Sequence, residues 1–114
     1  MSATAATASV EAALAHGVRM LERDPTLAAE QARQVLDASP GHPVARHLLG
    51  MAHSALGEPA RAIAILQPLS LEQPSAPRVW MALGAAHASN GQPVEAIAAI
   101  EHAARLQPAL PRVW

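Results

Sequence analysis

The sequence of 114 residues contains no cysteine, phenylalanine, tyrosine or lysine, and two tryptophans are its only large aromatic side chains. The lack of cysteine excludes a disulfide framework, a thiol nucleophile and a cysteine-based zinc site. Eight arginines and nine acidic residues give a net charge of −1, which does not support nucleic-acid binding. No run of about 18 apolar residues predicts a membrane span. The first ten residues lack the basic start and apolar segment of a signal peptide, so we expect a cytoplasmic location.

Alanine dominates what is present. It is the most frequent residue type in a chain that is 51% apolar. Alanine favours helices and is depleted in strands, so the composition predicts an all-α fold with closely spaced helices.

The prolines recur at one fixed interval, the one that separates Pro25 from Pro59. Nine of the ten form three series with this interval: Pro25, Pro59 and Pro93; Pro40, Pro74 and Pro108; Pro43, Pro77 and Pro111. Residues 43–76 and 77–110 are identical at 12 of 34 positions without a gap. A fixed period of this length is typical of a solenoid built from stacked repeats.

Each proline series has a mechanical interpretation. Proline is well suited to the first turn of a helix, so Pro43, Pro77 and Pro111 are predicted to open the first helix of a unit. Pro25, Pro59 and Pro93 are predicted in the same way to open the second helix. The series at 40, 74 and 108 is expected to end that second helix. Gly57 and Gly91 stand where a helix C-terminus favours a left-handed residue.

The segment that runs from Trp80 through Leu83, Gly84 and His87 to Ala96 and Pro108 resembles a tetratricopeptide repeat. Residues 43–76 are similar, with arginine in place of the tryptophan. Residues 9–42 resemble the motif mainly in their second half. The resemblance implies a right-handed superhelical α-solenoid of three helix-turn-helix repeats. We expect repeats at about 9–42, 43–76 and 77–110, a flexible N-terminus over 1–8 and the start of a fourth repeat at 111–114.

Three local features carry further expectations. The apolar spacing of Val10, Leu14, Val18 and Leu21 indicates that the first helix is shifted by one residue from the repeat register. Small residues at 50, 62, 84 and 96 are expected where helices approach most closely. Pro68 lies outside the three series and is predicted to bend or end the second helix of the middle repeat.

The sequence gives little indication of a catalytic site or a metal site. The sequence has six histidines, and His47 and Met51 are spaced four apart on one predicted helix, but a third ligand is missing. No nucleophile triad or glycine-rich phosphate loop has meaningful spacing. We therefore expect no enzymatic activity, no metal site and no cofactor within these residues.

The family resemblance implies a protein-interaction or scaffolding module that holds a peptide or partner surface in a concave groove. Transfer of the family's groove positions gives Val10, Ala13, Gly17, Met20 and Leu21 in the first repeat. The predicted peptide-binding groove consists of Met20, Val44, His47, Met51, Ser54, Arg78, Met81, Ala85, Ala88 and Ser89. This groove is apolar and rich in methionine, which favours an adaptable apolar protein or peptide partner. The methionines are equally compatible with filling gaps between helices. Only Arg78 matches the cations and amides that grip a terminal carboxylate in chaperone-binding members.

The predicted last helix presents Ile97, Ile100 and Ala104 without an expected cover, so we predict a homodimer through this C-terminal end. An alternative is that the chain is the N-terminal repeat array of a larger bacterial enzyme, of the sulfotransferase or oxygenase type. The array would then position a substrate or drive oligomerisation. The heavy use of alanine, arginine and proline suggests a bacterial source.

Overall fold

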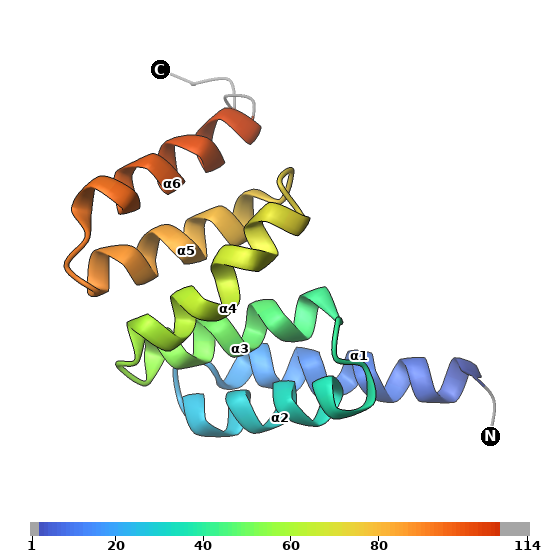
Figure 1. Cartoon of the computed structure of the whole chain (residues 1–114). Helices are drawn as coiled ribbons and strands as arrows, with labels where there is room; N and C mark the ends of the chain where they lie inside the picture. The colour runs from blue at the N-terminus through green and yellow to red at the C-terminus, as the bar shows by residue number, and fades with distance from the viewer. Residues whose placement is uncertain (1–2, 108–114) are drawn as a thin grey trace, which may run out of the picture.

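The computed structural model describes residues 3–107 and contains six α-helices in that range (Figure 1). No strand occurs among these residues. The helices are α1 (Ala3–Met20), α2 (Pro25–Ala38), α3 (Pro43–Ala55), α4 (Pro59–Glu72), α5 (Pro77–Ser89) and α6 (Pro93–Leu106). The predicted all-α fold of paired helices is confirmed.

Proline occupies the first residue of every helix from α2 to α6. The missing N–H is harmless there because the first turn of a helix has no internal partner for it. Asp24 and His42 add side-chain caps, accepting from the backbone N–H of Leu27 at 3.1 Å and of Ala45 at 3.3 Å. The predicted role of the prolines is therefore confirmed for α2 to α6, and Pro108 and Pro111 lie outside the described residues.

Two glycines end the first helix of the second and third hairpins. Gly57 and Gly91 have φ values of 76° and 73°, as the sequence predicted. After Gly57, the N–H of Glu58 donates to the carbonyl of His53 at 2.9 Å, and the N–H of Gly57 donates to the carbonyl of Ser54 at 3.1 Å. This pair of bonds satisfies the last carbonyls of α3 and reverses the chain toward α4. The equivalent bonds follow α5.

The first helix departs from the repeat pattern. Helix α1 begins at Ala3, inside the range 1–8 for which the sequence suggested a flexible N-terminus. Residues 3–8 are rich in alanine and contain no proline or glycine, so nothing in the sequence prevents the helix from extending. A Cβ on Gly17 would lie 2.6 Å from Leu48 and 3.6 Å from the Ala28 carbonyl, in the manner of Gly84 beside the Ala96 carbonyl. The repeat interval that separates Gly84 from Gly50 leads back to residue 16. In the structure, Gly17 occupies this position, which confirms the one-residue shift of α1.

The helices stack in chain order. Each helix packs against its neighbours in sequence, and the first helices of successive hairpins also touch, α1 with α3 and α3 with α5. The core lies between these layers and consists mostly of alanine and leucine, with Ala28, Ala45, Leu48, Ala62 and Leu66 fully buried. Trp80 on α5 links the third hairpin to the segment after α4, because its indole N–H donates to the Pro74 carbonyl at 3.0 Å. The centroid of its ring lies 4.1 Å from that of His102 on α6, a contact within the third hairpin.

Glycine permits the closest helix contacts. A Cβ on Gly50 would lie 2.6 Å from two atoms of Leu66, and one on Gly84 would lie 2.7 Å from Ile100. Helices α3 and α5 therefore lie closer to their partners than a side chain would allow.

Pro68 lies within α4, on an exposed part of the helix that continues to Glu72. The helix does not end there, and Figure 1 shows α4 changing direction along its length. The missing N–H of Pro68 removes one backbone bond, so a bend is the expected result.

Candidate binding groove

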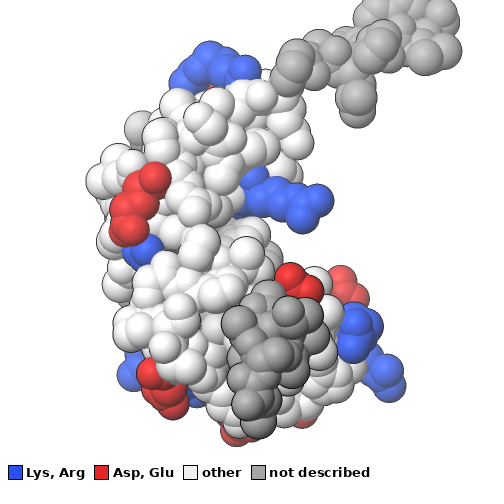
Figure 2. All heavy atoms as spheres, turned by 90° about the vertical axis from the view of Figure 1, so that its right-hand side faces the viewer, with Lys and Arg blue, Asp and Glu red and all other residues white. Residues whose placement is uncertain are grey.

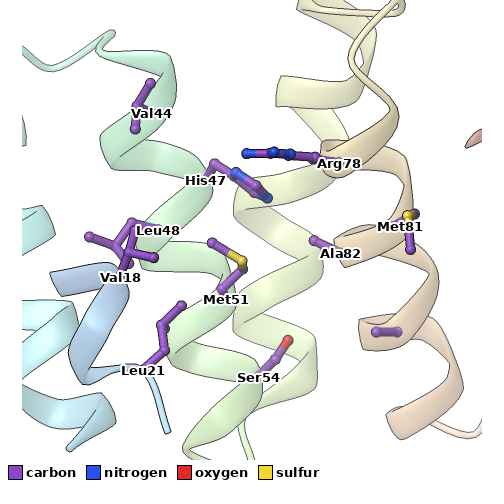
Figure 3. A pocket seen from close by; sticks show the side chains of 11 residues that line it. Val18, Leu21, Val44, His47, Leu48, Met51, Ser54, Arg78, Met81 and Ala82 are labelled. Carbon is purple, nitrogen blue, oxygen red and sulfur yellow. The ribbon is translucent and has the colours of Figure 1, made fainter. Parts of the chain in front are cut away.

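A groove of about 580 Å³ opens between the first helices of the three hairpins. Its walls come from α1, α3 and α5, and Figure 3 shows side chains from all three projecting into it. The lining residues are Val18, Leu21, Val44, His47, Leu48, Met51, Ser54, Arg78, Met81, Ala82 and Ala85.

Seven of the ten residues that the family resemblance suggested line this groove: Val44, His47, Met51, Ser54, Arg78, Met81 and Ala85. The other three do not. Met20 is half-buried and packs against the core around α2 and α3, whereas Ala88 and Ser89 are exposed at the end of α5.

The one-residue shift of α1 explains why Val18 was missed, whereas Leu48 and Ala82 lie on α3 and α5, outside the shifted helix. Of the groove residues in the first hairpin, Val18 lies on α1, one residue beyond the transferred position Gly17, and Leu21, itself a transferred position, directly follows the helix. Gly17 instead faces Leu48, which allows α1 to approach α3 closely. The apolar spacing of the first helix carried this signal, and applying the shift to the groove positions would have found Val18.

The groove is almost entirely apolar. Val18, Val44 and Met81 are each about half exposed, at 50%, 50% and 51% of their surface, so the apolar lining is open to solvent. Figure 2 shows a hollowed side of the molecule that is mostly white, with a blue, positively charged side chain projecting from it. Exposed apolar surface grouped in a concavity is typical of a binding site.

The polar atoms in the groove are few. Figure 3 shows the guanidinium of Arg78 beside the imidazole of His47, while Ser54 lies at the opposite end and Met51 between them. The His47 Nε2 and Ser54 Oγ atoms are buried and have no hydrogen-bond partner. Burial lowers the pKa of His47; a hydrogen bond with the backbone of Arg78 opposes this effect, and the positive charge of Arg78 adds to the lowering.

Two other histidines hold the hairpins together. His53 and His87 are nearly buried, at 5% and 8% exposure, and face the connections to the next helix. The Nδ1 of His53 lies 3.0 Å from Glu58, and the Nδ1 of His87 lies 2.9 Å from Gln92. The hydrogen bond with His53 lowers the pKa of the Glu58 carboxyl. These contacts link the end of one helix to the start of the next.

No group of three or more potential metal ligands comes together within the described part of the chain. His47 lines the groove beside Met51 and belongs to no such group within residues 3–107. None of the helices described is long and apolar enough to cross a membrane.

Comparison with known families agrees with the geometry of stacked hairpins. One sequence profile described as tetratricopeptide repeat matches residues 19–86, which is more than half of the chain, and a second matches residues 77–114. The chain belongs to the tetratricopeptide repeat family. No curated protein matched the chain in the comparison.

Membership of the tetratricopeptide repeat family indicates the general kind of function that such a groove serves. Repeats of this family typically mediate protein–protein interaction, and their all-helical fold is typically non-catalytic. Like other solenoids, the chain offers an extended surface built from equivalent positions on successive units, on which the side chains vary without changing the fold.

Proposed function

We propose that this tetratricopeptide repeat protein is a non-catalytic interaction module that binds an apolar peptide or partner surface in the groove between α1, α3 and α5. The observation that carries the proposal is the mostly apolar lining of a groove of about 580 Å³, formed by three successive hairpins. In this proposal the three repeats cover about residues 9–42, 43–76 and 77–110.

The methionines support this use of the groove. Met51 and Met81 line it, and Met81 is half exposed instead of filling a gap between helices. Methionine is flexible and polarizable, so it adapts to ligands of different shape. Met20, by contrast, packs against the core. The groove interpretation therefore suits Met51 and Met81, and the gap-filling interpretation suits Met20.

The test follows the methyl groups of the three methionines during titration with a synthetic amphipathic apolar peptide. We expect the NMR resonances of Met51 and Met81 to shift while that of Met20 changes little. Met81→Lys should weaken binding, because it places a charge on the apolar wall. Val94→Lys, at an exposed apolar residue on α6, is the matched control and should leave the affinity unchanged. Unchanged Met51 and Met81 resonances on binding, or equal losses of affinity in both variants, would show that the binding surface lies elsewhere.

A second contact surface is proposed on α6. Ile97 and Ile100 are 57% and 48% exposed, and Ala104 is also exposed, as expected from the sequence. The equivalent residues of α4, Ile63 and Leu66, are half-buried and buried under α5. We propose that a homodimer uses this face. Sedimentation should then give a dimer that Ile97→Lys converts to a monomer, and a monomeric parent chain would refute it.

Attachment of these repeats to a bacterial sulfotransferase- or oxygenase-type enzyme, and a cytoplasmic location, stay predictions from the sequence. Reading the coding sequence beyond residue 114 tests the first. A downstream phosphosulfate-binding loop would support the sulfotransferase alternative, and further repeats would contradict it.

A further inference from the structure

We propose that the occupant of the groove is an amphipathic α-helix that presents an apolar stripe to the methionine-lined wall and one carboxylate side chain to Arg78. This inference rests on the proposed function, since it specifies the ligand of the same groove. It follows from two properties of the lining: the shortage of hydrogen-bonding groups and the position of a single cation.

The shortage of polar groups favours a helix over an extended strand. The groove walls are helices, so most of the backbone N–H and carbonyl groups along them already bond within each helix. Of the lining side chains, only those of His47, Ser54 and Arg78 carry nitrogen or oxygen atoms. An extended peptide would bury backbone groups that these few side chains could not satisfy, which is unfavourable. A helix satisfies its own backbone and needs only apolar contact.

The cation favours an acidic side chain on that helix. Arg78 is exposed at the groove wall and has no ion-pair partner among the described residues. Arg46 and Arg61, in contrast, each contact a glutamate, at 2.7 and 3.6 Å. The charge of Arg78 is therefore available to a ligand, and a guanidinium can bind a carboxylate through two parallel hydrogen bonds.

His47 strengthens the same end of the groove. Its Nε2 atom is buried without a hydrogen-bond partner, and its ring lies beside Arg78 (Figure 3). A carboxylate held by Arg78 would also lie close to this imidazole and could accept a hydrogen bond from it. The apolar stripe would then extend past Met51 toward Ser54, away from the charged end. The carboxylate thus fixes the position and direction of an otherwise adaptable apolar contact.

The test uses three synthetic peptides of about 14 residues, ~21 Å long when helical. The first carries leucines at helical spacing and one glutamate at the edge of the apolar face. The second replaces that glutamate by glutamine. The third keeps the leucines and the glutamate of the first but has two central polar residues replaced by prolines, which prevents a helix. Fluorescence anisotropy gives the Kd of each peptide at low salt.

We expect the glutamate peptide to bind about tenfold more tightly than the glutamine peptide, and the proline peptide to bind most weakly. Arg78→Met should abolish the preference for glutamate and leave the Kd of the glutamine peptide within about twofold. Arg105→Met, which removes an exposed arginine of α6 outside the groove, is the matched control and should keep the preference.

The outcomes separate this inference from the proposed function. Equal affinity for glutamate and glutamine peptides, or a preference that survives Arg78→Met, overturns the carboxylate. Equal or tighter binding of the proline peptide overturns the helix, while groove binding itself stands. If none of the peptides binds or shifts the Met51 and Met81 methyl resonances, the proposed function fails and the inference fails with it.

Discussion

The contact between Gly50 and Leu66 offers a direct measure of how closely the two helices of a repeat pack. In Gly50→Ala, the new Cβ would lie 2.6 Å from both Cγ and Cδ2 of Leu66 and 3.1 Å from its Cδ1. Carbon atoms pack at about 3.5–4.0 Å, so roughly 1 Å of overlap must be relieved. Leu66 has no exposed surface and cannot turn into solvent. The helices must therefore separate or the leucine must adopt a strained rotamer.

The magnitude follows from two opposing effects. Overpacking of this kind costs about 1–3 kcal/mol, while replacing glycine by alanine inside a helix returns up to about 1 kcal/mol. We expect Gly50→Ala to lower the free energy of unfolding by about 1–2 kcal/mol. Each kcal/mol corresponds to a decrease of about 4–8 °C in the melting temperature of a domain of similar size. Circular dichroism during thermal and urea unfolding measures both quantities.

A double-mutant cycle isolates the contact. Leu66→Ala removes Cγ, Cδ1 and Cδ2, the atoms that the new methyl group would meet, and costs about 2–5 kcal/mol by itself. The double variant should lose about 1–3 kcal/mol less free energy of unfolding than the two single variants lose in sum. Gly41→Ala is the control, since nothing lies within 4 Å of its added Cβ. Single effects that simply add, to within the scatter seen for independent sites, would refute the claim that glycine is required here for close packing.

Three further outcomes are expected from other parts of the fold. Gly57→Ala should destabilise the chain by about 1 kcal/mol because its φ of 76° is unfavourable for alanine, and an unchanged urea midpoint would contradict this. Arg46→Gln removes the two hydrogen bonds to Glu72 at 2.8 and 2.7 Å, so the variant should melt below wild type by a margin that shrinks as salt rises; a margin independent of salt would argue against an ion pair. Burial lowers the pKa of His47 below its ordinary 6.5, so the unfolded chain binds this proton more tightly and the stability that neutral His47 contributes is lost as the pH falls through 6.5. NMR titration should give His47 a lower midpoint in the folded protein than in urea, and an equal or higher midpoint would contradict the burial.

Most of the fold was predictable because prolines and glycines mark where its helices begin and end. Pro59 and Pro93 open helices, and Gly57 and Gly91 reverse the chain, because each acts through its own backbone geometry. Such effects depend on local covalent structure and need no knowledge of distant contacts. The constant interval between these residues then indicates that successive hairpins stack in the same way.

The start of the chain was harder to predict because no proline or glycine marks the beginning of its first helix. No proline marks where α1 begins, and an alanine-rich segment is as compatible with helix over residues 3–8 as over the rest of α1. The groove was affected for the same reason. The family positions placed Gly17, Met20 and Leu21 on its wall, and only the packing of Gly17 against Leu48 shows that Val18 lies there in place of Gly17.

The side-chain environments at the groove also depend on packing between helices, which could not be predicted from the sequence. The family positions suggested His47, Ser54 and Arg78, but not that the Nε2 of His47 is buried without a partner beside an arginine. That arrangement arises only when α3 and α5 are brought side by side. Residue types at helical spacing indicate a face of a helix, and the charge state of that face depends on its neighbours.

The walls of the groove have no direct connection across it. Among the described helices, α1 and α5 both touch α3, but they do not touch each other. The separation between Val18 and Met81 therefore depends on how successive hairpins pack, through α2 with α3 and α4 with α5 as well as through the smaller contacts of α1 with α3 and α3 with α5. Small rotations of the same sense between successive hairpins would add, so the outer hairpins can open or close around a bound peptide without breaking any contact that spans the opening.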